Sequence, residues 1–65
     1  MLLPKWSEKM KAARKEKKLS VQALADLSGV SHGTLERMEN GHAPTLNSIE
    51  AVTRALGMSV SKFFE

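Results

Sequence analysis

The stretch SVQALADLSGVSHGTLERMENG, residues 20–41, decides how this chain folds. Its apolar residues recur at helical spacing on both sides of a glycine, and no part of it alternates between apolar and polar residues as a strand does. Ser20 and Ser31 are typical of the position before a helix, because a serine hydroxyl accepts hydrogen bonds from first-turn N–H groups that have no other partner. The stretch therefore predicts two short helices, over residues 21–28 and 32–39.

The residues between and after these helices predict tight turns. Gly29 can adopt the left-handed conformation that ends a helix without a Cβ clash. Val30 is apolar and is expected to fill the angle between the helices, while Ala25 is small enough for a close crossing. Asn40 or Gly41 supplies the left-handed residue that ends the second helix. Two short helices joined by such a turn form a helix-turn-helix, whose second helix enters the major groove of DNA.

The flanking sequence predicts three further helices, over residues 5–17, 46–56 and 60–64. Apolar residues recur in them every three or four positions, which is the period of one buried helix face. Thr45 and Ser59 are the expected caps before the last two helices. Since no segment predicts a strand, the fold class is all-α, a compact bundle of five short helices.

The predicted core follows from the inward positions of these helices. It consists of Trp6, Met10, Ala13, Leu19, Leu24, Ala25, Val30, Leu35, Met38, Leu46, Ile49, Val52, Leu56, Val60 and Phe63. We expect Phe63 or Phe64 to lie inside and the other to face a partner protomer or a shallow surface patch. Leu2 and Leu3 are exposed in a monomer, or they cover the last helix or join a dimer contact.

Length and composition exclude several classes of protein. A chain of 65 residues is at most one domain, which we assign to residues 1–65. It has no cysteine, which excludes a disulfide framework, a thiolate zinc site and a cysteine nucleophile. No apolar run approaches the roughly 18 residues of a membrane span, and the start lacks the regions of a signal peptide. We expect a cytoplasmic protein without a membrane segment.

The sequence also argues against an enzyme or a ligand-binding protein. It holds two histidines with no spaced carboxylates beside them, which is too little for a metal site. It offers no activated nucleophile and no paired carboxylates in a pocket. We therefore expect no catalytic residues, no cofactor, no metal and no small-molecule site.

The charge of the chain is unevenly distributed. The net charge is +3, but residues 1–19 hold seven basic and two acidic residues, and residues 20–65 hold three basic and five acidic residues. The basic segment is either a solvated helix face or an electrostatic surface for a polyanion.

The helix-turn-helix stretch and its flanks resemble the Xre/Cro-C1 type domain of phage repressors and bacterial regulators. The residues that match the family pattern are Leu24-Ala25, Gly29-Val30-Ser31, Glu39-Asn40-Gly41, Pro44 and Leu56-Gly57. The resemblance covers about residues 6–64 and implies a lambda-repressor-like bundle with the helix-turn-helix at its second and third helices.

The resemblance also implies which residues meet DNA. The candidates for reading bases are Ser31, His32, Gly33, Thr34 and Arg37. The candidates for contacting phosphate are Lys17, Lys18, Gln22, Asn40, Gly41 and His42. Arg37 suits a bidentate contact to guanine. Gln22 is a substitute for Val21, which stands where the family usually has glutamine.

Three features of the chain have a more particular interpretation. The resemblance implies an ion pair between Arg14 and Glu39 that holds the end of the recognition helix. Gly33 is unfavourable inside a helix, so either the backbone approaches DNA there or a neighbouring side chain needs the room. The recognition helix carries Glu36 and Glu39 against one Arg37, so affinity must depend on the first helix and the loops.

These features predict a sequence-specific transcriptional regulator of double-stranded DNA. The expected mode is repression by promoter occupancy, as a homodimer on a pseudo-palindromic operator. The dimer contact is expected in the last helix and its preceding loop. Two alternatives stay open, namely an antitoxin or protein-docking component of a toxin–antitoxin pair, and the N-terminal domain of a longer regulator.

Overall fold

The computed structural model describes residues 4–65, and within that range every regular element is an α-helix. The helices are α1 (Lys5–Glu16), α2 (Val21–Ser28), α3 (His32–Glu39), α4 (Leu46–Ala55) and α5 (Val60–Phe63). The predicted all-α bundle of five helices is confirmed. Leu2 and Leu3 lie outside the described residues.

Three helices end one residue earlier than the sequence indicated. Lys17, Leu56 and Phe64 each still donate a backbone hydrogen bond to a carbonyl four residues back. They nevertheless leave the helix, as C-caps, because the chain turns away after them. These ends therefore lie at residues 16, 55 and 63 in place of 17, 56 and 64.

Hydroxyl groups start four of the five helices. Ser20, Ser31, Thr45 and Ser59 each accept a hydrogen bond from the backbone N–H three residues on. A cap of this kind contributes about 1 kcal/mol to stability. Pro4 precedes α1, which has no side-chain cap. The boundaries of the helix-turn-helix therefore follow from residue types visible in the sequence.

Left-handed residues follow α1, α2, α3 and α4. Gly29, Gly41 and Gly57 have φ of 78°, 88° and 70°, as glycine permits at no steric cost. Lys18 has φ of 58° and performs the same task after α1, where no glycine announces it. Its conformation costs roughly 1–2 kcal/mol. The turn is closed by a hydrogen bond of 3.1 Å from the Leu19 N–H to the Arg14 carbonyl.

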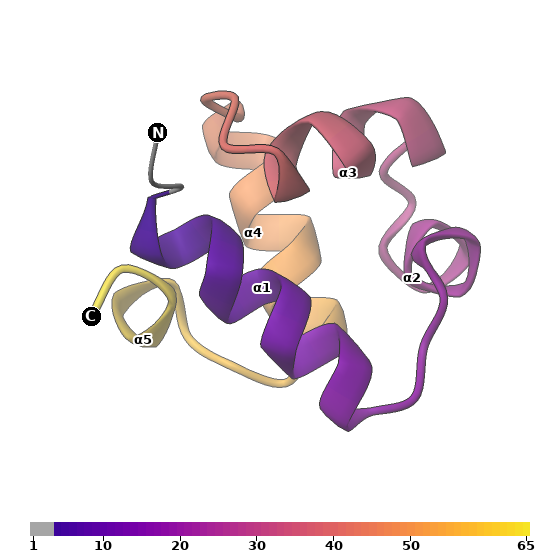
Figure 1. The fold of residues 1–65 in the computed structure, drawn as a ribbon, viewed down its shortest axis with the longest axis horizontal. Helices are drawn as coiled ribbons and strands as arrows, with labels where there is room; N and C mark the ends of the chain where they lie inside the picture. The colour runs from indigo at the N-terminus through magenta and orange to yellow at the C-terminus, as the bar shows by residue number, and fades with distance from the viewer. Residues whose placement is uncertain (1–3) are drawn as a thin grey trace.

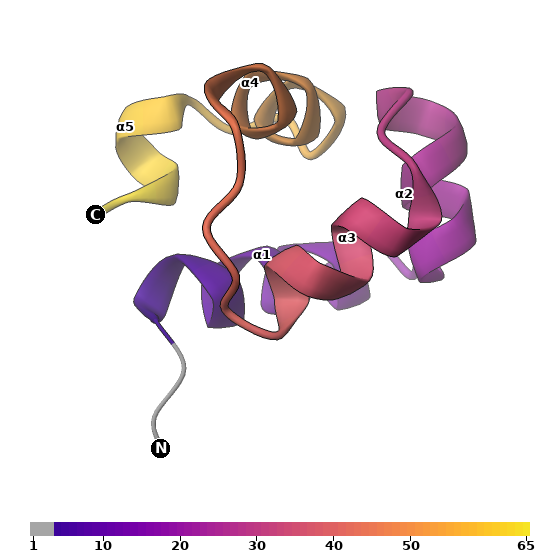
Figure 2. The same cartoon turned by 90° about the horizontal axis from the view of Figure 1, so that it is seen from above.

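The helices are arranged in two layers, and α2 lies across one end of both layers (Figures 1 and 2). In Figure 2, α1 and α3 lie on one side, and α4 and α5 lie on the other. α2 packs against both α3 and α4, while α1 packs against α3 and α5. As a result α3 is supported on its inner face by two helices and leaves its other face uncovered. None of the described helices is long and apolar enough to cross a membrane.

The core fills the space between the two layers. Its buried apolar residues are Met10, Leu24, Ala25, Leu35, Met38, Ile49, Val52, Leu56 and Phe63. Five further predicted core residues are only partly buried and pack against it, namely Trp6, Ala13, Leu19, Val30 and Val60. Phe63 lies inside and meets Trp6 with a ring-centroid distance of 6.0 Å, while Phe64 is 52% exposed.

One predicted core residue is wrong. Leu46 is 64% exposed, because it is the first residue of α4 and lies one turn before Ile49, where the packed face begins. The interior also holds polar groups that the predicted core does not include. Ser7 and Thr53 are buried, and their hydroxyls donate to the carbonyls of Glu39 and Glu50 at 3.0 and 3.1 Å.

Candidate nucleic-acid interface

The uncovered residues of α3 form one continuous surface, which we call the outer face of α3. It consists of His32, Gly33, Glu36, Arg37 and Asn40, all of them exposed. The opposite side of the helix buries Leu35, Met38 and Glu39. Burial of one face and exposure of the other fix which side chains α3 presents to a partner.

Ser31 and Thr34 bind to each other at the start of α3. The Ser31 hydroxyl accepts from the Thr34 N–H at 3.3 Å and donates to the Thr34 hydroxyl at 2.8 Å. Thr34 is also half-buried, whereas Ser31 is exposed. Both hydroxyls therefore define the first turn of the helix, and a base contact from either one stays a prediction.

Gly33 has open space around it. A Cβ built at this position meets no heavy atom within 4 Å, apart from its own helix and chain neighbours. The explanation that a neighbouring side chain needs the room is therefore wrong. Close approach of the backbone to a partner is the explanation that stays as a prediction.

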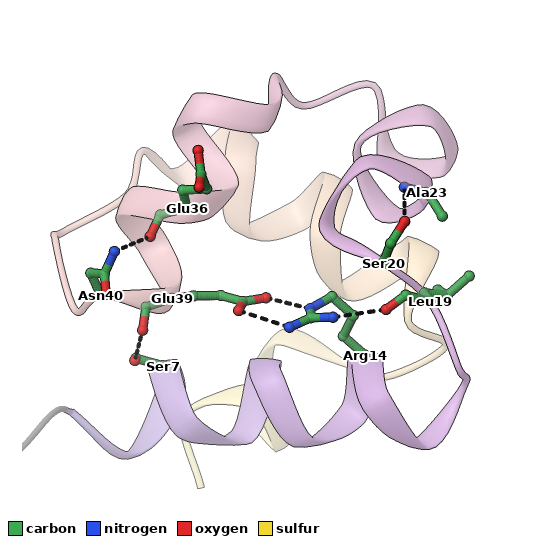
Figure 3. A network of polar contacts seen from close by, with 8 residues as sticks. All are labelled: Ser7, Arg14, Leu19, Ser20, Ala23, Glu36, Glu39 and Asn40. Atoms are coloured by element: carbon green, nitrogen blue, oxygen red, sulfur yellow. Dashed lines mark hydrogen bonds and ion pairs between the residues drawn. The ribbon is translucent and has the colours of Figure 1, made fainter.

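The ion pair of Arg14 with Glu39 holds α3 from behind (Figure 3). Arg14 Nε lies 2.6 Å from Glu39 Oε2, and Nη2 lies 3.1 Å from Oε1. The third guanidinium nitrogen donates to the Leu19 carbonyl at 2.8 Å. The hydrogen bond with Glu39 raises the pKa of the Arg14 guanidinium above its ordinary value.

This ion pair joins three parts of the chain. Arg14 belongs to α1, Glu39 ends α3, and Leu19 immediately precedes the N-cap of α2. The two charged side chains are only 12% and 9% exposed, so they are removed from most solvent screening. Such a two-pronged contact fixes geometry as well as charge. The orientation of α3 relative to α1 therefore depends on it.

Four of the six predicted phosphate contacts, all except Gln22 and the half-buried Gly41, fall into two groups. Lys17 and Lys18 are exposed in the turn that leads to α2, while Asn40 and His42 are exposed after α3. The amide of Asn40 caps its own helix by donating to the Glu36 carbonyl at 2.9 Å. The two groups therefore flank the helix-turn-helix, one before its first helix and one after its second.

Gln22 is less available than its sequence position suggests. It is exposed in the first turn of α2, but its Nε2 donates to Asp26 Oδ1 at 3.0 Å. A phosphate contact would bring an anion close to that carboxylate. Residues four apart on a helix are neighbours on its surface, so the pairing of Gln22 with Asp26 could have been predicted from the sequence.

A hollow adjoins the end of the outer face of α3. Its volume is about 380 Å³, and it lies between α3, the following loop and the start of α4. Arg37 and His42 line it together with Thr45 and Ser48, whose hydroxyls are 3.0 Å apart. Sequence reasoning assigned Thr45 only as a helix cap and did not single out Ser48. The hollow combines the Arg37 guanidinium with hydroxyl groups, which suits an anion.

Comparisons with known proteins agree with this arrangement. A family model described as helix-turn-helix (HTH_3) matches residues 10–63. An immunity repressor protein of Bacillus phage phi105 is 40% identical over 55 residues, which are 83% of this chain and 38% of that protein. The chain thus spans about two fifths of the length of this relative.

Two solved structures have similar folds. The master regulator for biofilm formation SinR, solved in complex with DNA, superposes with a TM-score of 0.86 at 29% identity. The superposition covers 92% of this chain and 98% of that chain. A transcriptional regulator from Vibrio cholerae superposes with a TM-score of 0.82 at 34% identity, covering 92% of this chain and 34% of that one.

Proposed function

The chain belongs to the helix-turn-helix family of Xre/Cro-C1 type regulators, and on that premise we propose that it is a transcriptional regulator that binds double-stranded DNA sequence-specifically. The observation that carries the proposal is the outer face of α3, which is exposed along its whole length while Arg14 and Glu39 hold the helix from behind. One α-helix fits the major groove of B-form DNA. The regulator represses by occupying a promoter, and it works in the cytoplasm on the nucleoid.

The charge distribution supports a complex in which some residues contact phosphate and others read bases. Lys17 and Lys18, with the exposed Lys5 and Lys15 of α1, attract phosphate without regard to sequence. His42 adds a contact on the far side of the helix-turn-helix. His32 and Arg37 project from the outer face of α3 and read base edges. Sequence choice thus depends on few residues, and non-specific affinity depends on many.

A fluorescence-anisotropy titration tests the proposal. The chain is titrated into a duplex obtained by selection and into a scrambled duplex of the same composition, at two salt concentrations. We expect a preference on the order of 10³-fold for the selected duplex. Equal affinity for all duplexes at every salt concentration contradicts a sequence-specific regulator.

Gly33→Ala is expected to separate stability from function. Alanine favours a helix over glycine by up to about 1 kcal/mol, and the added methyl group meets no side chain. The melting temperature should therefore rise by a few degrees, while affinity for the selected duplex falls because the methyl group obstructs close approach. Thermal denaturation and anisotropy measure the two effects. Unchanged affinity shows that the backbone does not approach DNA at this residue.

We propose further that the protein binds DNA as a homodimer through the α4–α5 region. A shallow hollow of about 310 Å³ is lined there by Glu50, Thr53, Arg54, Met58 and Val60. Glu50 and Arg54 are exposed, opposite in charge and one helical turn apart. In a two-fold interface the same surface faces itself, so Glu50 of one copy can pair with Arg54 of the other.

A charge swap tests this interface. Glu50→Arg should weaken dimerisation on the order of tenfold, because like charges then face each other across the two-fold axis. The double variant Glu50→Arg with Arg54→Glu should restore it. Sedimentation at several protein concentrations measures the dimer, and Glu8→Arg on α1 is the matched control. The proposed interface is wrong if Glu50→Arg and Glu8→Arg behave alike.

A further inference from the structure

Glu36 is the one acidic residue on the outer face of α3. Its side chain is 59% exposed. In Figure 3 its carboxylate points away from the ion pair of Arg14 and Glu39. The phosphate backbone of DNA repels a carboxylate, so an acid here is costly unless it meets a hydrogen-bond donor. A hydrogen-bond donor on the partner is therefore needed to offset the repulsion of the Glu36 carboxylate.

The helical period places Glu36 as close to the groove as Arg37. At about 100° per residue, Gly33 and Asn40 lie near the centre of the outer face. Arg37 lies about 50° to one side of that centre, and Glu36 lies about 50° to the other. A docking of α3 centred on Gly33 and Asn40 therefore brings both Arg37 and Glu36 towards base edges.

The Glu36 carboxylate is free to accept hydrogen bonds from a partner. The imidazole Nδ1 of His32 lies 3.8 Å from Glu36 Oε1, which is beyond hydrogen-bond distance. Both side chains are about half exposed, so water screens this pair strongly. Asn40 donates to the carbonyl of Glu36 and leaves its carboxylate unoccupied.

We propose that Glu36 is a specificity-determining residue that selects cytosine at one position of each half-site, an inference that rests on the proposed function. An ionised carboxylate only accepts hydrogen bonds. In the major groove guanine and thymine present acceptors and repel it, whereas cytosine presents the N4 amino donor. Adenine also presents a donor, at N6, but its neighbouring N7 is an acceptor and would face the second carboxylate oxygen, which cannot donate to it. Cytosine is therefore the base that fits Glu36 best.

The substitution Glu36→Gln gives this inference a specific signature. A glutamine amide donates to N7 and accepts from N6 of adenine, so it matches adenine bidentately. In selections from random duplexes, the wild-type chain should enrich cytosine at one position of the half-site by roughly tenfold. Glu36→Gln should move that preference to adenine. Glu36→Ala should remove it and leave the other positions unchanged.

Glu8→Gln is the matched control, because it removes an exposed acid from α1 without touching α3. If Glu36→Gln and Glu8→Gln both strengthen binding to every duplex by the same factor and change no base preference, Glu36 is only a repulsive surface charge and the inference is wrong. That outcome leaves the proposed function standing if the wild-type chain still selects a sequence. A wild-type chain that enriches no sequence overturns both.

Discussion

Arg14→Ala is expected to lower the free energy of unfolding by about 3 kcal/mol and to weaken DNA binding with it. The substitution leaves the Glu39 carboxylate, which is 9% exposed, without its guanidinium partner. It also removes the donor to the Leu19 carbonyl, so the turn before α2 loosens together with the end of α3. For a domain of this size the melting temperature should fall by roughly 10–25 °C.

Thermal denaturation followed by circular dichroism measures the loss of stability, and anisotropy below the melting temperature measures the loss of binding. Lys15→Ala is the control, because it removes a neighbouring, exposed charge of the same helix. The double variant Arg14→Met with Glu39→Met should be less destabilised than Arg14→Ala, since it leaves no buried charge unpaired. A melting temperature of Arg14→Ala equal to that of Lys15→Ala contradicts the structural role of the ion pair.

Arg37→Ala should reduce the preference for the selected duplex by roughly 10–100-fold, because a bidentate contact to a base contributes about 1–3 kcal/mol of discrimination. The melting temperature should hardly change, since the Arg37 side chain is exposed. Anisotropy titrations against the selected duplex and its single-base variants measure the effect. The loss should concentrate at one base pair of each half-site.

Lys17→Ala is the control for Arg37→Ala, because it removes a phosphate contact and leaves the base contact in place. Lys17 is exposed before α2 and is expected to meet phosphate, so its removal should weaken all duplexes about equally. It should also reduce the slope of log affinity against log salt by about 1. If Arg37→Ala lowers affinity uniformly, as Lys17→Ala does, Arg37 contacts phosphate and does not read a base.

Most of the fold could be predicted from local chemistry. The hydroxyls of Ser20, Ser31, Thr45 and Ser59 cap the helices that the sequence indicated, because capping needs only a residue type and three residues of helix. The conformation of Lys18 could not be predicted in this way, since lysine carries no preference for left-handed backbone.

The error at Leu46 has a different cause. A helical stripe predicts which face is buried, but it does not predict how far along the helix the neighbouring elements extend. Leu46, the first residue of α4, continues the apolar stripe, but no neighbouring element covers it, so it is exposed. The buried hydroxyls of Ser7 and Thr53 depend in the same way on tertiary packing.

The candidate site was predictable where the family pattern is strong. The pairing of Arg14 with Glu39 joins residues 25 positions apart, and only the resemblance indicated it. The hollow beside Arg37 and His42 depends on how α3, the loop after it and the start of α4 come together, which no local pattern encodes. The bonds of Ser31 with Thr34 and of Gln22 with Asp26 show that candidate side chains also serve their own helices.

Selection of bound sequences from random duplexes by the wild-type chain tests the central claim most directly, namely that the outer face of α3 reads DNA for a two-fold dimer. The account predicts a pseudo-palindromic site whose half-sites are centred about 10–10.5 base pairs apart, the spacing of one helical turn. It also predicts that Arg37→Ala loses the preference at one position of each half-site. A selection that enriches no common sequence, or one that Arg37→Ala leaves unchanged, would contradict it.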